Sequence, residues 1–249
     1  MSQVNIKDSV IFITGANRGI GRALVEVAVE GGAAKVYAAA RDTSKLTGLV
    51  SRDPARIIPV ELDVTDGEQI RRAVKQAADT QILINNAGVA GYSGIIFQFS
   101  EEAARRELEV NYFGPLHLAR AFFPVLSGKP QAAVANVISV GGLSTFPMAA
   151  TYSASKAAAH SLTQGLRAEL HSRGITVFGI YPGPIDTDMA DGVDMEKESP
   201  RNVAVRVYQG FAEGREDITT DKFADEFVVN LRNDAKAVER DNAQFAHQS

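Results

Sequence analysis

Short apolar runs rich in β-branched residues alternate with longer stretches of helical periodicity, from residue 10 to about residue 180. Most of the short runs are apolar on both faces, which is typical of parallel strands covered by helices on two sides. Such alternation predicts successive right-handed βαβ units and an α/β fold with a doubly wound, mostly parallel sheet. The predicted strands are residues 10–13, 35–39, 57–61, 82–85, 133–139 and 176–180, and the predicted helices are 19–30, 67–79, 101–126 and 149–173.

The regular alternation ends after Pro182. Residues 183–200 are polar and mixed, helical patterns then flank a short segment at 216–219, and residues 221–249 have the pattern of a charged helix. A long loop at the carboxyl edge of a parallel sheet is where substrates usually bind. We therefore expect one domain over residues 1–249, with a substrate loop at about 183–215 and a helical C-terminal tail at about 221–249.

Composition narrows the class of protein. A length of 249 residues with 45% hydrophobic and 22% charged residues suits one large globular domain. The net charge of -4 gives no electrostatic reason to expect nucleic acid or an anionic membrane as a partner. The sequence shows neither a secretory signal pattern nor an apolar run of about 18 residues, so we expect a cytoplasmic protein without a membrane partner. With no cysteine and scattered histidines, we expect no metal site.

A glycine-rich segment lies between the first predicted strand and the first predicted helix. Glycines at this position let the backbone turn tightly and approach a pyrophosphate, which then sits on the helix N-terminus. A glycine-rich turn that merely packs strand against helix is the alternative, but the context favours dinucleotide binding, as in Rossmann-like folds. The residues of the segment expected to bind the cofactor are Gly15, Asn17, Arg18, Gly19, Ile20 and Gly21.

The end of the second predicted strand should hold the residue that contacts the adenosine ribose. An acidic residue there would bind both ribose hydroxyls and repel a 2′-phosphate, but the sequence has Ala40 followed by Arg41 and Asp42. Arg41 can pair with a 2′-phosphate, and Arg18 could approach it from the other side. We therefore expect NADP(H), with NAD(H) as the weaker alternative. Both arginines could instead be solvated surface charges, and Asp42 would oppose the phosphate if its side chain turned inward.

Tyr152 and Lys156 are four residues apart in a predicted helix and therefore share one face. A nearby ammonium stabilises phenolate, so we expect Lys156 to lower the pKa of Tyr152 from its ordinary value of about 10. Tyr152 would then serve as a general acid/base for a substrate oxygen. Ser139, at the end of the fifth predicted strand, lies at the same sheet edge and can donate a hydrogen bond to that oxygen.

Together these residues closely resemble the short-chain dehydrogenase/reductase family over about residues 8–190. The motifs stand in the family's order: the glycine segment 14–21, the run Asn85, Asn86, Ala87 and Gly88, then Asn111, Ser139, the Tyr152 and Lys156 pair, and Pro182 with Gly183 followed by Thr187.

The resemblance implies a role for each catalytic position. Tyr152 would be the proton donor or acceptor, Ser139 would orient the substrate oxygen, and Lys156 would hold the nicotinamide ribose while tuning Tyr152. Asn111 would hold a water in a proton relay that reaches Lys156. Taken alone, Asn111 could equally be a mid-helix polar residue that points to solvent.

The resemblance also implies cofactor contacts. Asp63, next to Val64, would accept a hydrogen bond from the adenine amino group, although an Asp after a strand is also a common cap or turn residue. Asn86, Ala87 and Gly88 would lie under the adenosine ribose. The loop that braces the nicotinamide carboxamide would comprise Pro182, Gly183, Ile185 and Thr187.

The function implied is an NADP(H)-dependent oxidoreductase, a carbonyl reductase, that interconverts a ketone or aldehyde and an alcohol. The alternatives are an NAD-dependent alcohol dehydrogenase using the same site, a dehalogenase- or epimerase-type reaction through the same tyrosine, and a catalytically silent NADP(H)-sensing protein. The intact set of catalytic residues argues against the sensor. Tyr92, Phe146 and Met148 should lie near the pocket mouth, where they could contact substrate or only form its wall.

Many family members end in a seventh strand and a glycine-rich tail that supports tetramers, but here that region is only residues 215–220. We therefore expect a homodimer through the helices at 101–126 and 149–173, and leave the tetramer open. Ala154, Ala157 and Ala158 would permit close helix approach, but they would equally suit packing on the sheet.

Overall fold

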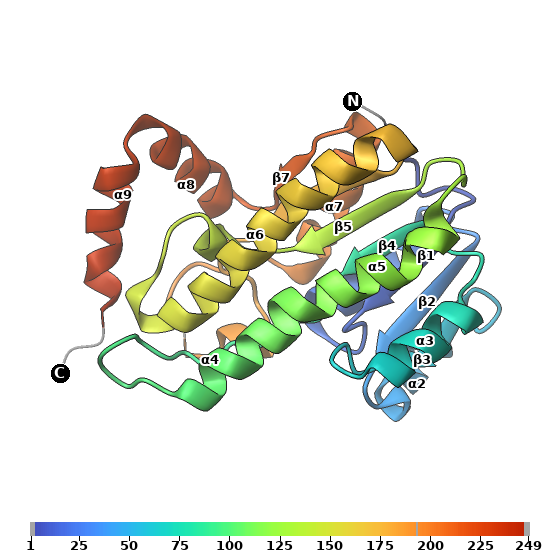
Figure 1. The fold of residues 1–249 in the computed structure, drawn as a ribbon, viewed down its shortest axis with the longest axis horizontal. Coiled ribbons are helices and arrows are strands. Elements are labelled where there is room, and N and C mark those ends of the chain that lie inside the picture. Colours follow the sequence, from blue (N-terminus) through green and yellow to red (C-terminus); the bar gives the residue numbers. More distant parts are fainter. Residues whose placement is uncertain (1–2, 193, 247–249) are drawn as a thin grey trace.

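The computed structural model describes residues 3–192 and 194–246, and Figure 1 shows a central sheet between layers of helices. The sheet has seven strands in the order β3-β2-β1-β4-β5-β6-β7, and every pairing is parallel. The chain starts at the centre and winds outward in both directions, which confirms the predicted Rossmann-like, doubly wound fold. The strands are β1 (Val10–Thr14), β2 (Lys35–Ala40), β3 (Ile57–Glu61), β4 (Ile82–Asn85), β5 (Ala133–Val137), β6 (Thr176–Tyr181) and β7 (Asp217–Thr219).

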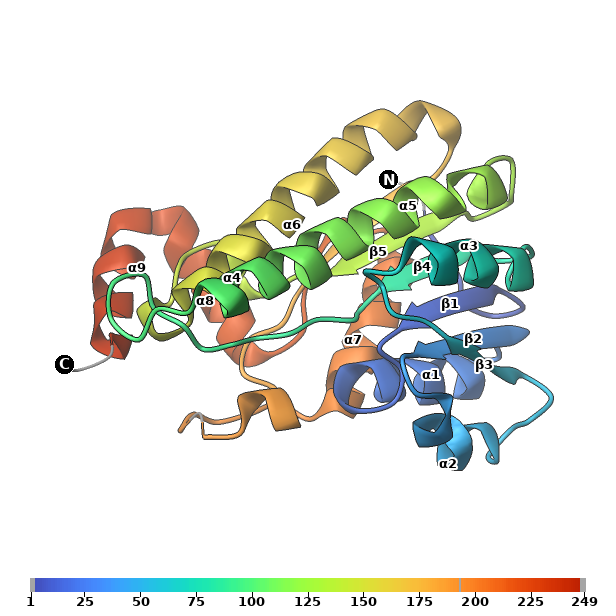
Figure 2. The same cartoon turned by 60° about the horizontal axis from the view of Figure 1, so that its bottom comes forward.

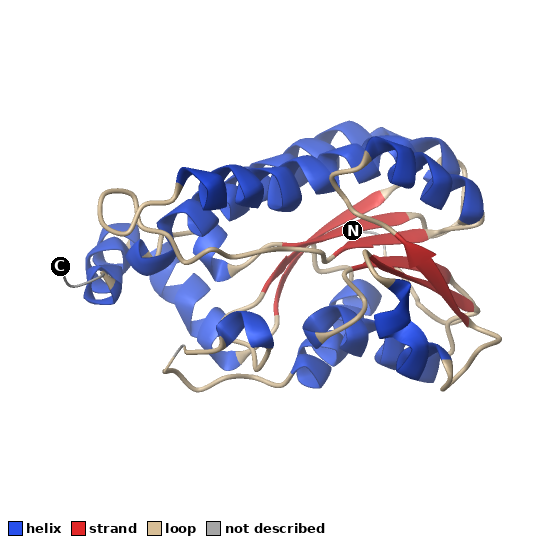
Figure 3. Ribbon diagram, turned by 90° about the horizontal axis from the view of Figure 1, so that it is seen from below, coloured by secondary structure: helices blue, strands red, loops and turns tan. Residues whose placement is uncertain are grey.

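Helices cover both faces of the sheet, as Figure 3 shows from below. One face packs against α1 and α7 through a core that includes Ile13, Leu24 and Phe211. The other packs against α3, α5 and α6 through a core that includes Phe12 and Phe122. The helices are α1 (Gly19–Glu30), α2 (Thr47–Val50), α3 (Gly67–Gln76), α4 (Glu101–Leu108), α5 (Gly114–Leu126), α6 (Ala150–Leu170), α7 (Pro200–Glu213), α8 (Lys222–Asn233) and α9 (Ala235–Asp241).

Most element boundaries agree with the prediction to within a few residues, and three differences bear on the site. Strand β5 ends at Val137, so Ser139 lies beyond it and begins the 3-10 turn Val140–Gly142. The expected helix at 101–126 is interrupted by the π-helical turn Glu109–Phe113 between α4 and α5. The expected strand at 176–180 extends one residue further, to Tyr181. Each difference lies at the carboxyl edge of the sheet or beside it.

The predicted substrate loop at 183–215 is shorter than expected, because α7 occupies much of it. Val203, Val207 and Phe211 of α7 are fully buried in the core against α1. The segment that remains irregular therefore ends at Ser199, where a side-chain hydrogen bond caps the start of α7. After α7 the short strand β7 pairs with β6 and adds the seventh strand to the sheet.

The C-terminal tail folds back over the carboxyl end of β6 as α8, α9 and the 3-10 turn Asn242–Phe245. Figure 1 shows it, in red, beside the N-terminal part of α6. Ala224, Phe227 and Val238 of the tail are buried in a third cluster with Ile138 and Tyr181. Figure 2, turned from the first view, also shows the tail beyond the sheet rather than over either helical layer. The tail is therefore placed to cover one end of the sheet's carboxyl edge.

Candidate active site

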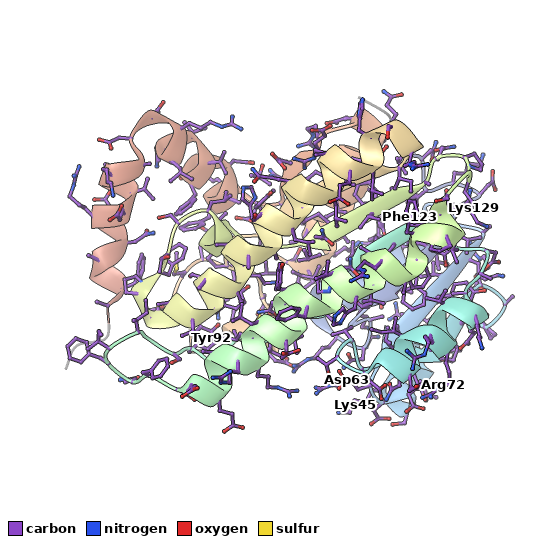
Figure 4. The ribbon with its side chains drawn as sticks, viewed as in Figure 1. Lys45, Asp63, Arg72, Tyr92, Phe123 and Lys129 are labelled. Atoms are coloured by element: carbon purple, nitrogen blue, oxygen red, sulfur yellow. The ribbon has the colours of Figure 1, made fainter. Side chains whose placement is uncertain are left out.

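A single cavity of about 1010 Å³ at the carboxyl edge contains nearly all of the predicted site. This volume is at the upper end of the range for ligand pockets, so it can hold a dinucleotide with a small substrate. Figure 4 labels residues at its two ends, with Lys45 and Asp63 beside β3 and Tyr92 beside α4. Among the predicted residues, Asn111 alone does not line the cavity. Those that do are Gly15, Asn17, Arg18, Gly19, Ile20, Gly21, Arg41, Asp63, Val64, Asn86, Ala87, Gly88, Ser139, Tyr152, Lys156, Pro182, Gly183, Ile185 and Thr187.

The glycine segment forms a backbone cradle, and side chains in place of its glycines would fill the space. Gly15 and Gly19 have φ of 66° and 51°, in the left-handed region that favours glycine. A Cβ on Gly21 would lie 2.2 Å from the carbonyl oxygen of Gly15. Arg18, at the N-cap of α1, makes no side-chain hydrogen bond to the first helical turn. The first-turn N–H groups thus remain available to an anion, which fits a pyrophosphate.

Asn86 and Thr14 hold this cradle against the start of the next loop. The Asn86 side-chain amide donates to the carbonyl oxygens of Thr14 and Gly15, at 2.8 Å and 3.2 Å. The Thr14 hydroxyl accepts from the backbone N–H groups of Asn86 and Ala87, each at 3.0 Å. Asn86 was expected under the adenosine ribose. It does line the cavity, but its side chain supports the glycine segment.

Two basic side chains line the cavity at the end of β2. Arg41 and Lys45 are both exposed there. Asp42 also lines the cavity, and its carboxylate accepts from the backbone N–H and the hydroxyl of Ser44 at 3.0 Å and 2.6 Å, bonds that lower its pKa. Sequence reasoning missed Lys45, which a search for a second basic residue within one helical turn of Arg41 would have found.

Arg18 lines the cavity, and its contact with a 2′-phosphate stays a prediction. Its guanidinium pairs with Asp188 at 2.5 Å, across the mouth of the cavity, and both side chains are more than 60% exposed at 63% and 66%. An exposed pair of this kind contributes little stability and is readily broken. Asp63, for its part, accepts from the backbone N–H and the hydroxyl of Thr65 at 2.9 Å and 2.7 Å, so the turn role is present.

The catalytic candidates meet on one wall of the cavity. The Ser139 hydroxyl accepts from the N–H of Gly141 at 3.0 Å and forms a hydrogen bond with the hydroxyl of Tyr152. Lys156 lies one turn along α6, with its Nζ 5.7 Å from the centre of the Tyr152 ring. Its ammonium donates to the carbonyl oxygen of Val137 at 2.9 Å. Parallel strands that end at one edge thus bring Ser139 beside a helix that starts there.

The pKa of Tyr152 differs from the sequence prediction. Burial raises the pKa of the Tyr152 hydroxyl well above its ordinary value, and the hydrogen bond with Ser139 only partly offsets this effect. Burial also lowers the pKa of Lys156 to about 8, since an ammonium away from water is costly. In this structure desolvation therefore outweighs the attraction that Lys156 was expected to supply. At neutral pH Tyr152 is a protonated phenol beside a mostly protonated Lys156.

Asn111 lies in the π-helical turn and is 1% exposed, so it does not point to solvent. Its oxygen accepts from the N–H of Val89 at 2.9 Å, and its amide donates to the carbonyl oxygen of Val89 and the hydroxyl of Ser155, each at 2.9 Å. Both amide hydrogens are therefore used within the protein. π-Helical turns are frequent at functional sites. This one places Asn111 on the same side of Gly88 as Lys156, because a Cβ built on Gly88 would lie 3.2 Å from the Asn111 Oδ1 and 3.4 Å from the Lys156 Nζ.

The loop after β6 lines the cavity next to the glycine segment. A Cβ on Gly19 would lie 3.0 Å from the Thr187 methyl group, so the two loops are in contact. The far end of the cavity is apolar, and it is lined by Tyr92, Phe146, Met148, Met189, Met195, Phe223 and Phe245. Phe223 and Phe245 come from the C-terminal tail and were missed by sequence reasoning. No local pattern around them indicates a pocket.

Within residues 3–192 and 194–246, no helix has the length and apolar character needed to cross a bilayer. Over the same residues, no group of histidines, aspartates and glutamates is arranged to hold a metal ion.

Comparison with known proteins gives concordant matches. The family model described as short chain dehydrogenase matches residues 9–198. The short chain dehydrogenase pigC of Monascus ruber is 31% identical over 215 residues, covering 82% of this chain and 71% of that protein. An uncharacterized oxidoreductase of Staphylococcus aureus is 33% identical over 81% of this chain and 90% of its own.

Two solved structures extend the comparison. A short chain dehydrogenase from Burkholderia cenocepacia in complex with NADP has 39% identity and a TM-score of 0.90, covering 96% of this chain and 98% of its own. A short chain dehydrogenase/reductase from Burkholderia phymatum in complex with NAD has 26% identity and a TM-score of 0.84, covering 94% and 96%.

Proposed function

Because this chain belongs to the short-chain dehydrogenase family of oxidoreductases, we propose that it is an NADP(H)-dependent carbonyl reductase acting on a ketone or aldehyde. The observation that carries the proposal is the convergence of Ser139, Tyr152 and Lys156 on one wall of the cavity that also contains the glycine cradle. A dinucleotide in the cradle and a substrate at that wall would share one enclosed space. On this proposal residues 1–249 act as one dinucleotide-binding and catalytic domain.

The cofactor, when bound, supplies the hydride that forms the new C–H bond at the carbonyl carbon. The Tyr152 hydroxyl donates its proton to the carbonyl oxygen, so that the C=O bond becomes an alcohol. Ser139 holds that oxygen through a hydrogen bond, and the Lys156 ammonium stabilises the phenolate left on Tyr152 until it regains a proton. Asn111 positions the backbone of Val89 at the edge of the same wall.

Because burial raises the pKa of Tyr152, its hydroxyl is in the protonated form with which reduction begins. Reduction needs a proton donor, and a buried phenol retains its proton through the neutral range. Oxidation by an NAD-dependent alcohol dehydrogenase would need Tyr152 as a base, which burial disfavours. A silent sensor would have no use for a buried lysine beside a half-buried tyrosine, since burying an ammonium is costly.

The proposal of NADP(H) rests on the basic end of the cavity. Ala40 leaves no carboxylate at the end of β2, while Arg41 and Lys45 can pair with a 2′-phosphate. The solved relative with NADP shares 39% of its residues with this chain, and the one with NAD shares 26%. Asp63, Val64 and residues 86–88 would hold the adenosine, and the loop 182–187 would hold the carboxamide.

The test is a panel of ketones, aldehydes and alcohols assayed with each cofactor at the nicotinamide absorbance band. We expect oxidation of NADPH with carbonyl compounds and a lower kcat/KM with NADH. Turnover confined to NAD-dependent alcohol oxidation would overturn the proposed direction and cofactor. Cofactor binding without turnover across the panel would favour the sensor.

We also propose a homodimer through α4, α5 and α6. Leu108 on α4 and Phe113 in the π-helical turn before α5 are exposed, at 39% and 37%. Ala154 and Ala157 of α6 are exposed, which favours helix approach over packing on the sheet. Light scattering on the eluted protein would distinguish the dimer from a monomer or tetramer.

A cytoplasmic location stays a prediction.

A further inference from the structure

The apolar end of the cavity has a consistent chemical character. The residues that line it from segments 140–153, 189–195 and 222–246 are all uncharged. The charged residues that line the cavity come from other segments: Arg18, Arg41, Asp42, Lys45, Asp63, Arg106, Lys156 and Asp188. Arg106, on α4, is exposed and is a cation that a charged substrate could reach. A substrate group held beyond Tyr152 would therefore contact apolar side chains.

The tail is attached to this end of the cavity at two points. At its start, the Asp221 carboxylate accepts from the backbone N–H groups of Gly183 and Ala224, each at 2.8 Å. A Cβ on Gly183 would lie 2.8 Å from the Phe223 ring, so the ring packs directly on this loop. At its end, the Asn242 amide donates to the Ser144 hydroxyl at 3.3 Å and the Thr145 carbonyl oxygen at 3.1 Å.

These attachments place an aromatic cluster at the cavity wall. Phe146 stacks with Phe227 at 5.7 Å between ring centres and meets Phe245 edge to face at 5.6 Å. Phe223 stacks with Phe227 at 5.9 Å. Phe227 is buried behind the others, whereas Phe146, Phe223 and Phe245 are half-buried and line the cavity. Ring faces and edges at such spacings are suited to contact a further ring.

We propose that the substrate is a neutral carbonyl compound whose larger substituent is an aromatic ring, held by Phe146, Phe223 and Phe245. This inference rests on the proposed function, because it places the carbonyl oxygen at Ser139 and Tyr152. A carboxylate on the ring would lose its hydration without gaining a cation from the three segments that form this end. The buried carboxylate of Asp221, behind Gly183, would also repel it. A ketone with only methyl groups would leave the aromatic wall without contact.

Acetophenone and 4-acetylbenzoate form a matched pair that isolates the charge. We expect kcat/KM for 4-acetylbenzoate to be on the order of a hundredfold lower, because its carboxylate must be desolvated. Equal or better use of 4-acetylbenzoate would overturn the inference. Loss of that preference in an Arg106→Ala variant would then identify Arg106 as the group that binds the anion.

Phe223→Ala and Phe245→Ala test the tail's contribution. Each should raise KM for acetophenone by about tenfold, with a much smaller change in KM for propanone. Val229→Ala is the matched control, since Val229 is 54% exposed on α8 itself. A purely structural role for the two rings would instead lower activity with both ketones and weaken the cofactor site. Unchanged acetophenone kinetics in both variants would overturn the inference.

A binding measurement separates this inference from the proposed function. Acetophenone can be titrated into the NADP-loaded protein by calorimetry, with and without Phe223→Ala. If the protein reduces no ketone but binds acetophenone, and Phe223→Ala weakens that binding, the proposed function is contradicted and the aromatic site is supported. If propanone and acetophenone are reduced with equal kcat/KM, the aromatic site is contradicted and the proposed function is supported.

Discussion

In the cofactor half of the cavity the walls are largely backbone, and a Cβ on Gly21 would collide with the Gly15 carbonyl oxygen at 2.2 Å. In the substrate half the walls are whole side chains, such as Phe146 and Phe245, which meet at 5.6 Å between ring centres. The first half binds through N–H groups and charges, whereas the second offers apolar surface. A site for a constant ligand can thus be made from main chain, while selection among substrates is left to side chains.

The largest effect is expected for Tyr152→Phe, because Tyr152 lies on the wall between the two halves of the cavity. Removing the hydroxyl should lower reductive kcat by about 10²- to 10⁴-fold, the usual contribution of a general acid, while NADPH affinity is retained. Single-turnover kinetics and cofactor titration would measure the two effects. Tyr112→Phe is the control, because Tyr112 neighbours Asn111 without lining the cavity. Near-normal turnover in Tyr152→Phe would remove this residue from the mechanism.

Arg41→Asp should change the cofactor half alone. A carboxylate in place of the guanidinium loses a charge-assisted contact and repels a 2′-phosphate, so the NADPH/NADH ratio of kcat/KM should fall by about ten- to a hundredfold. Steady-state kinetics with both cofactors, at fixed acetophenone, would measure it. Lys45→Gln should cause a smaller shift in the same direction. An unchanged ratio in both variants would contradict the proposed phosphate site.

The pH dependence of reductive kcat/KM tests the catalytic wall that lies between the two halves of the cavity. The lowered pKa of Lys156, about 8, means that its ammonium loses its proton as pH rises through that value. Tyr152, whose pKa is raised, stays protonated over this range. Reductive kcat/KM should therefore be flat below the pKa of Lys156 and fall about tenfold per pH unit above it. A profile that rises through the same range would mean that neutral Lys156 is the active form.

Asn242→Ala should give the smallest effect, in the substrate half. Removing its amide loses two hydrogen bonds that attach the tail to residues 144–145, which should raise KM for acetophenone about fivefold. NADPH affinity, measured by fluorescence titration, should not change. Asn230→Ala, at an exposed position on α8, is the control. A matching loss of NADPH affinity in Asn242→Ala would show that the halves are not independent.

The same division explains what could be predicted from sequence. The fold and the glycine cradle follow from residues that are neighbours in the chain, since βαβ periodicity and a glycine turn are local features. The aromatic wall does not, because Phe146 lies about 75 to 100 residues before Phe223 and Phe245 and meets them only after folding.

The protonation states of Tyr152 and Lys156 could not be predicted from the sequence either. Spacing indicated correctly that Tyr152 and Lys156 share a helix face, yet the sign of the Tyr152 pKa shift depends on how far both are withdrawn from water. The π-helical turn at Asn111 likewise has no sequence pattern of its own. Spacing therefore identified the residues of this wall but not their protonation states.

Asp221 joins the tail to the rest of the molecule through bonds to the Gly183 N–H, the Thr220 hydroxyl and the Ala224 N–H. None of these bonds involves a side chain that faces substrate. The residues of the tail that face the pocket can therefore be exchanged without removing the bonds that anchor it. New substrate ranges are then reachable by single substitutions in the tail, without passing through forms that fail to bind the cofactor.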